Sequence, residues 1–184
     1  MTSAPVGDVD ALLATLQAGA HATDAEDVDL LAHGLQCAAL LAEVAPDDPE
    51  LQVAGLVHDV GTVLWPDRPR THARAGAAAV AGLLGKRVAW LVGQHDQAKR
   101  YLVTIEPRYA SSLSPASVRT LEVQGGRLDD AERARLESEP GLADLLTLRR
   151  ADDEAKVPGR AVPDITHWRP AVERLSASAS ARHL

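Results

Sequence analysis

The spacing of apolar positions predicts a chain that is nearly all α-helical. In most segments apolar residues recur about every three to four positions, as on one face of an amphipathic helix, and no segment alternates convincingly as a strand would. The fold class is therefore predicted to be all-α, a helical bundle. The expected helices cover residues 9–19, 25–45, 51–61, 71–85, 86–103, 117–126 and 141–156, with an outer helix at about 164–175.

The breaks between these segments indicate one domain. Proline-containing stretches at 46–50 and 65–70 read as a turn and a loop, and Gly85 separates two helices. Residues 1–176 are predicted to form a single domain, with its core at about 20–156. The stretch SASASARHL occupies residues 176–184. Residues 177–184 are expected to form a disordered tail.

Composition narrows the function classes. A chain of 184 residues can bury a real hydrophobic core, and its formal net charge of -7 argues against unspecific nucleic-acid binding, although a small basic pocket remains possible. The single cysteine cannot form an internal disulfide, which favours the cytoplasm. No stretch has transmembrane length, and the first residues do not read as a signal peptide. The oligomeric state is left open.

Candidate metal ligands occur on five of the predicted helices. The stretch GLVHDVG places His58 next to Asp59 in an apolar, presumed central helix. Ligands that converge from separate helices are a common way to build a metal site inside a bundle. The six candidates, four histidines and two aspartates, are His33, His58, Asp59, His72, His95 and Asp152.

This set suits two ions better than one. Adjacent helical residues point about 100° apart, so His58 and Asp59 cannot chelate from one face, and Asp59 suits a carboxylate bridge between two metals. Imidazole and carboxylate without thiolate favour Fe, Mn or Zn. The alternative is that each histidine is a hydrogen-bonded core residue. Three further histidines lie in polar contexts and read as surface residues: His21, His167 and His183.

The H…HD…D pattern of His33, His58, Asp59 and Asp152 resembles the HD-domain superfamily of metal-dependent phosphohydrolases. The additional His72 and His95 resemble its di-iron branch, which includes myo-inositol oxygenase and the phosphonate-cleaving HD oxygenases. Three stretches are similar to the phosphonate-cleaving type: HDQAKRYL (95–102), LSPASVRTLEVQGG (113–126) and LRRADDEAK (148–156). The resemblance covers about residues 20–156. It implies an Fe(II)/Fe(III) pair and an O2-dependent oxidation of a 1-hydroxyphosphonate at C1, with C–P cleavage and phosphate release.

The resemblance also implies residue roles. The six candidate ligands match the iron ligands of the family, with Asp59 bridging, and Lys99, Ser117 and Arg149 match positions that hold phosphonate oxygens. The helical spacing is consistent, because Lys99 follows His95 by four residues and Arg149 precedes Asp152 by three. The alternatives are a solvated polar face for the two cations and a helix cap for Ser117. No catalytic residue beyond the ligands is expected.

Two positions depart from the family pattern. Glu26 matches a glutamate that meets the substrate's amino group, but Thr23 stands where the family has a tyrosine, and the two could instead form a capping box. Thr62 stands where the family often has a second histidine. The expected substrate is a molecule like 2-amino-1-hydroxyethylphosphonate, with room for a bulkier group. The alternative function is an HD phosphohydrolase that acts on a phosphate ester.

Overall fold

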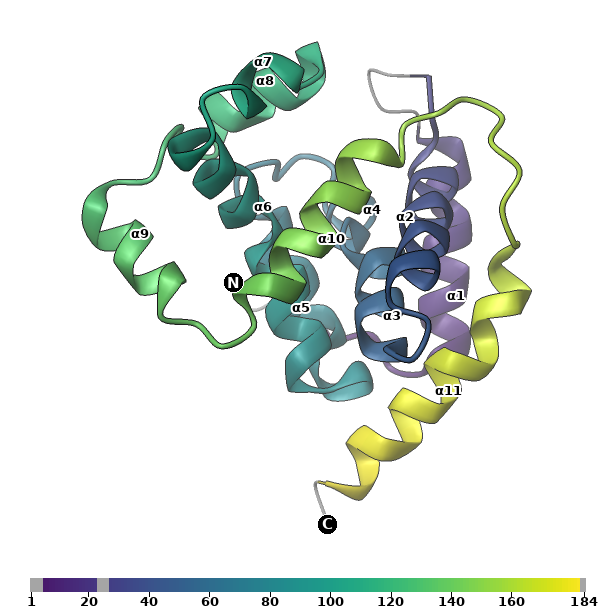
Figure 1. The fold of residues 1–184 in the computed structure, drawn as a ribbon. Coiled ribbons are helices and arrows are strands. Elements are labelled where there is room, and N and C mark those ends of the chain that lie inside the picture. Colours follow the sequence, from purple (N-terminus) through teal and green to yellow (C-terminus); the bar gives the residue numbers. More distant parts are fainter. Residues whose placement is uncertain (1–4, 23–26, 183–184) are drawn as a thin grey trace.

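The computed structural model describes residues 5–22 and 27–182, and all regular structure in these ranges is helical (Figure 1). The predicted all-α class is therefore confirmed for the described residues. The helices are α1 Val9–Ala18, η1 Gly19–His21, α2 Leu30–Val44, α3 Pro49–Val57, α4 Val60–Leu64, α5 His72–Leu84, α6 Lys86–Ile105, α7 Tyr109–Ser112, α8 Pro115–Val123, α9 Asp130–Glu137, α10 Leu142–Glu154 and α11 Ile165–Ala181.

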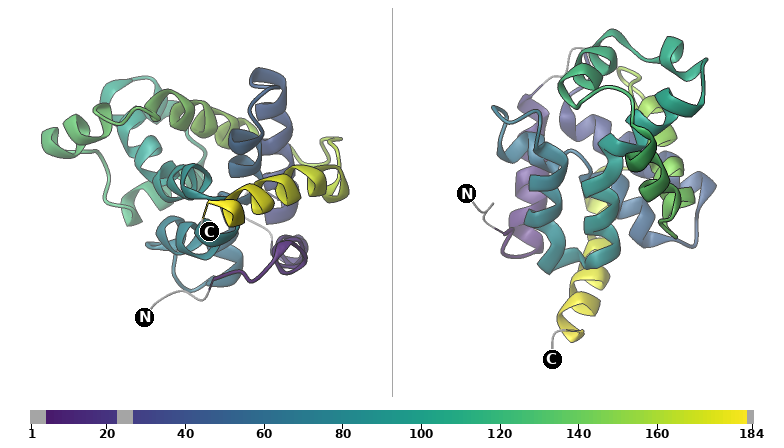
Figure 2. Two further views of the ribbon diagram at one scale, coloured as in Figure 1. Left: turned by 90° about the horizontal axis from the view of Figure 1, so that it is seen from below. Right: turned by 90° about the vertical axis from the view of Figure 1, so that its left-hand side faces the viewer.

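A central group of helices surrounds the predicted ligand positions. Helix α6 packs along α5 and also contacts α3 and α10, while α2 packs on α3 and α10. Helices α1 and α11 contact each other, and α11 also packs on α5 and α3. In Figures 1 and 2, α7, α8 and α9 extend to one side of this group and α11 runs away from it toward the C-terminus.

Aliphatic side chains fill the core, as expected for a chain without phenylalanine. Leu41 of α2, Val57 of α3, Leu91 of α6 and Leu148 of α10 are completely inaccessible to solvent. Such packing supplies most of the stability of short helices, which are marginal on their own. Among the described residues, no helix combines the length and the hydrophobicity that crossing a membrane requires.

The structure corrects several predicted boundaries. Helix α2 begins at Leu30 rather than at residue 25, because the side chain of Asp29 caps it by accepting a hydrogen bond from the amide of Ala32. The helix predicted over 51–61 is broken: α3 ends at Val57 and α4 begins at Val60. His58 and Asp59 therefore lie at a junction between two helices, where both side chains can turn toward one site.

Two helices, α7 and α9, lie in segments for which no helix was predicted. Helix α9 is short and mostly exposed, so it lacks the apolar repeat, yet a capping box between Asp129 and Glu132 starts it. The prediction of a disordered tail from residue 177 is wrong for 177–181, since α11 continues to Ala181. The side chain of Ala179 is buried, and the hydroxyls of Ser178 and Ser180 donate to carbonyls one turn earlier.

Candidate metal centre and adjoining cavity

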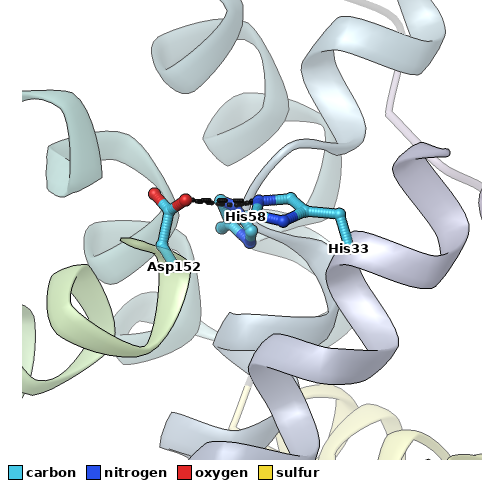
Figure 3. Close-up of side chains that lie close together, drawn as sticks. All are labelled: His33, His58 and Asp152. Carbon is cyan, nitrogen blue, oxygen red and sulfur yellow. Dashed lines mark hydrogen bonds and ion pairs between the residues drawn. The ribbon is translucent and has the colours of Figure 1, made fainter. Parts of the chain in front are cut away.

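All six predicted ligands converge on one place, where they form two groups of three. The first group consists of His33 from α2, His58 from the α3–α4 junction and Asp152 from α10 (Figure 3). The Nε2 atoms of the two histidines lie 3.1 Å apart, and Asp152 Oδ1 lies 3.2 Å from His33 Nε2 and 3.8 Å from His58 Nε2. Ligand atoms about 2.1 Å from one ion and at right angles to each other would be separated by about 3 Å. This group could therefore hold a metal ion.

The second group consists of Asp59, His72 and His95. The Nε2 atoms of its histidines are 3.0 Å apart, and Asp59 Oδ1 lies 3.4 Å from His72 and 3.6 Å from His95. The other carboxylate oxygen, Oδ2, lies 3.6 Å from His58 Nε2 and 4.0 Å from His33 Nε2. Asp59 thus presents one oxygen to each group, which is the arrangement that a bridging carboxylate requires.

The orientation of the four imidazoles is set by main-chain carbonyls. Each Nδ1 lies 2.7–2.8 Å from a carbonyl oxygen. In a neutral ring, Nδ1–H donates to that carbonyl and leaves the Nε2 lone pair available for a metal, a pattern typical of metal-binding histidine. The carbonyls belong to Ala155 for His33, Gly55 for His58, Pro69 for His72 and Val92 for His95. Three of these four partners lie three residues before their histidine, so the local backbone already favours this orientation.

Two glycines allow the helices that carry the ligands to approach closely. A Cβ on Gly34, next to His33, would collide with the carbonyl oxygen of Leu56 in α3. A Cβ on Gly61, two residues after Asp59, would collide with the main chain of His72 and approach Gly76 in α5. The glycine of the HDVG stretch therefore brings Asp59 within reach of the second pair of histidines.

The pKa values of the histidines differ between the two groups. Burial disfavours the charged form of His33, but the hydrogen bond and charge of Asp152, together with Asp59, outweigh it and raise the pKa of His33 to about 9. Burial and the charges of His72 and His58 lower the pKa of His95 to about 3. Burial opposes ionisation of Asp152, yet Arg149 and the neighbouring histidines hold its pKa well below the usual range. The first group therefore attracts a proton where a metal would bind.

A cavity of about 210 Å³ opens onto both groups. Its wall includes five of the six candidate ligands, together with Lys99, Ser117 and Arg149. These three side chains are buried, so the alternative of a solvated polar face does not apply to Lys99 or Arg149. Burial and the nearby Arg149 lower the pKa of Lys99 to about 8, and its ammonium donates a 2.7 Å hydrogen bond to the hydroxyl of Thr120.

Arg149 is held by two carboxylates. Its Nη1 lies 2.7 Å from Asp152 Oδ2, while its other donors contact Asp153, whose Oδ2 also accepts a 2.5 Å hydrogen bond from Tyr109. Asp152 thereby gives Oδ2 to Arg149 and keeps Oδ1 for the histidine pair. The guanidinium is fixed at the edge of both the cavity and the candidate metal site.

The structure adds cavity residues that the sequence argument missed. Lys156 lines the cavity, and its Nζ donates a 2.9 Å hydrogen bond to Ser117 Oγ; Thr120 and Gln124 also contribute to the wall. Lys156 follows Asp152 by four residues, the same spacing that separates Lys99 from His95, so the helical spacing alone could have pointed to it. Ser117 is not the cap of α8: Ser114 is the N-cap residue, and its hydroxyl oxygen accepts a hydrogen bond from the amide of Ser117.

The two positions that depart from the family pattern have different outcomes. Thr62 lines the cavity near Trp65 and Pro66, so a shorter side chain does stand in this wall. Thr23 and Glu26 lie outside the described residues. The expected role of Glu26 toward an amino group, and the alternative capping box of Thr23 and Glu26, therefore stay predictions.

Comparison with known proteins agrees with this geometry. The model of the HD domain family matches residues 30–152, which extend from the start of α2 to Asp152. The chain belongs to the HD domain family. It is also 38% identical over 157 residues to the hydroxymethylphosphonate dioxygenase of Gimesia maris, covering 80% of this chain and 78% of that protein.

A second relative differs in the substrate that its name states. The [1-hydroxy-2-(trimethylamino)ethyl]phosphonate dioxygenase (glycine-betaine-forming) of Leisingera caerulea is 32% identical over 158 residues, covering 82% of this chain and 80% of that protein. Both relatives are named as phosphonate dioxygenases, and they support the predicted resemblance to the phosphonate-cleaving branch. The substrates in the two names differ beyond C1: hydroxymethylphosphonate has no C2, whereas the other substrate carries a trimethylamino group at C2.

Proposed function

We propose that the protein is a non-haem di-iron oxygenase that cleaves the C–P bond of a 1-hydroxyphosphonate and releases phosphate. The observation that carries the proposal is the position of Asp59, with one oxygen toward His33 and His58 and the other toward His72 and His95. In the proposed centre His33, His58 and Asp152 hold one iron, His72 and His95 hold the other, and Asp59 bridges them. The two irons would supply O2 activation and oxidation at C1.

The side chains of the chain itself would bind and orient the substrate. Lys99 and Arg149 lie on the same wall as the ligands and would pair with the phosphonate dianion, with Arg149 acting as a planar fork and Lys99 as a point charge. The hydroxyl of Ser117, held by Lys156, would donate to a third oxygen. This arrangement would turn the phosphonate toward the cations and leave C1 and its hydroxyl beside the metal centre.

The cavity supports a compact substrate. Its volume of about 210 Å³ lies below the range of about 300–1,000 Å³ that is common for drug-sized ligands. We infer a molecule like 2-amino-1-hydroxyethylphosphonate, in which Glu26 would meet the amino group and the short Thr62 would leave room for a larger substituent. The names of the two relatives, one with no C2 and one with a trimethylamino group at C2, support a variable far end.

A substrate panel with and without O2 tests the proposal. Protein loaded with iron would be incubated with hydroxymethylphosphonate, 2-amino-1-hydroxyethylphosphonate, its trimethylamino analogue and a set of phosphate monoesters. Phosphate release from phosphonates only, and only with O2, is the expected result. Release from the esters without O2 would establish a hydrolase instead. Metal analysis and EPR on the same sample should give two irons per chain and a half-integer signal from a coupled mixed-valent pair.

A further inference from the structure

A second and larger groove lies on the other side of α6 from the metal centre. Its volume is about 650 Å³, and it is bounded by α5, α6, α9 and the segment before α5. Helix α6 contributes Trp90, Gly93, Gln94, Asp96 and Gln97 to this groove, whereas it contributes His95 and Lys99 to the smaller cavity. No residue lines both the groove and the smaller cavity, so the groove is separate from the proposed substrate site.

One side chain in the groove lacks the partner that its chemistry requires. Asp96 is only 9% exposed, and its Oδ1 is shielded from solvent without a hydrogen-bond partner among the described residues. A buried carboxylate oxygen left unpaired costs more free energy than most single interactions contribute. Such atoms occur in native structures chiefly where a ligand, ion or water completes the site. Because Asp96 also lines the groove, a ligand that presents a hydrogen-bond donor, such as an amino group, would pair with this carboxylate once its oxygen turns toward the groove.

The rest of the groove carries charges of both signs: Glu132 and Glu139 line it together with three arginines. Arg70 and Arg74 are exposed on the α5 side, and Arg135 stands on α9. No ion pair or side-chain hydrogen bond joins Arg70 or Arg74 to a carboxylate of the described part of the chain. Guanidinium groups in this position suit phosphate, phosphonate or carboxylate oxygens. Trp90 adds an aromatic surface, and its ring packs against Gly141, where a Cβ would collide with it.

We propose that this groove binds a small organic ligand with an amino group at one end and an acidic phosphorus group at the other. The amino group would donate to Asp96, and the acidic group would pair with Arg70 and Arg74 at the rim. Occupancy would stiffen the segments that carry His72 and His95, because Thr71 directly precedes His72 and Asp96 directly follows His95. The proposal is independent of the reaction assigned to the metal centre.

Binding to two matched pairs of probes tests this assignment. The short pair is 2-aminoethylphosphonate and ethylphosphonate, and the long pair is adenosine 5′-monophosphate and inosine 5′-monophosphate, which lacks the exocyclic amino group. Calorimetry would use metal-loaded protein carrying Lys99→Ala, so that binding in the smaller cavity is weakened. We expect the amine-bearing member of at least one pair to bind at least about ten-fold more tightly than its partner, the range of one charge-assisted hydrogen bond.

Two variants test whether that binding takes place in the groove. Asp96→Asn should reduce the affinity for the amine-bearing probe at least about ten-fold and remove the preference within the pair. Glu139→Gln, which removes the same charge from an exposed position of the groove, should change the affinity less than about three-fold, as expected for a solvated charge. Absence of binding by both amine-bearing probes, or equal binding to wild type and Asp96→Asn, would overturn the proposal. Neither result depends on whether the protein consumes O2.

Discussion

The two halves of the candidate metal centre are built from similar ligands but differ in their surroundings. His33, His58 and Asp152 are 5% exposed or less, and Arg149 pairs with the free oxygen of Asp152. In the other half, the side chain of Asp59 is 25% exposed, and its ion-pair contacts among the described residues are all with imidazoles. In one half the carboxylate is thus deeply buried and balanced by a fixed cation, whereas in the other half it is partly exposed and, in the described part of the chain, has no cation beside it other than imidazoles.

This difference predicts how each half behaves without metal. The first half has a carboxylate and a histidine that share a proton, since the pKa of His33 is raised to about 9. The second half has a histidine whose pKa falls to about 3 and therefore stays neutral at pH 7. A metal that binds His33 must displace a proton, and a metal that binds His95 need not. The bridging Asp59 makes the two events dependent on each other.

The largest expected effect comes from removing the bridge. Asp59→Ala deletes one oxygen from each half, so both metals should fall below about 0.2 per chain and activity should drop at least about 1,000-fold. His72→Ala touches one half only and should keep about one metal per chain. Elemental analysis of both variants after identical loading measures the contrast. Two retained metals in Asp59→Ala would show that the carboxylate does not bridge.

Most of the candidate metal centre could be predicted from the sequence. Ligand type, placement on separate predicted helices and the family resemblance singled out the six residues, and the structure brings all of them together. What the sequence could not provide was the break between α3 and α4, because an apolar run such as GLVHDVG reads as continuous helix. The break lies beside Gly61, whose main chain packs closely against α5, and that contact is a tertiary feature. The spacing of apolar residues along the sequence does not indicate such contacts.

The residues of the cavity could also be predicted only in part from the sequence. Lys99 and Arg149 were predicted from the family resemblance, and their helical spacing from a ligand on the same helix is consistent with that prediction. Thr120 and Gln124 could not be predicted, since α8 contains none of the ligands and reaches the cavity only through its packing. The double pairing of Arg149 with Asp152 and Asp153 was also hidden, because RRADD reads equally well as a solvated surface.

The second prediction contrasts the two buried cations. Arg149→Met leaves Asp152 and Asp153 without their cation and should destabilise the metal-free protein by about 3–5 kcal/mol. Lys99→Met removes a cation whose pKa is already lowered to about 8 by burial and by Arg149, so it should leave stability nearly unchanged. The same Lys99→Met change should weaken phosphonate binding by about 2–5 kcal/mol, because phosphonate charge loses its partner.

Urea unfolding and equilibrium binding, measured on both variants, separate these effects. A Lys99→Met protein that is as unstable as Arg149→Met would mean that the ammonium is a structural partner rather than a substrate contact. The free enzyme should also bind phosphonate less well as the pH rises through about 8, where Lys99 loses its proton. In Lys99→Met that loss of affinity should disappear.

The third prediction concerns the proton that His33 binds in protein without metal. The pKa of His33 is raised from 6.5 to about 9, so its contribution to the stability of metal-free protein is fully present below about pH 6.5 and is lost as the pH rises through about 9. The loss should amount to at most about 3 kcal/mol. Metal-loaded protein should lack it, since the ion replaces the proton. Thermal unfolding between pH 6 and 9.5, with His33→Gln as the control, measures the difference; an equal decline in the control would assign it to other groups.

The smallest expected effect concerns Thr62, which lines the cavity. The phosphonate-cleaving oxygenases that the chain resembles often have a histidine at this position. Thr62→His adds an imidazole beside the proposed reacting end without touching either group of ligands, so metal content should stay at its wild-type value. Because the cavity holds only about 210 Å³, the added ring should disfavour substrates with a bulky C2 substituent relative to hydroxymethylphosphonate. We expect the ratio of kcat/KM for the trimethylamino substrate to that for hydroxymethylphosphonate to fall about 3- to 30-fold, equivalent to about 0.7–2 kcal/mol. Thr62→Ser keeps the space open and should leave the ratio unchanged. A ratio that is the same in all three proteins would show that C2 of the substrate lies away from Thr62.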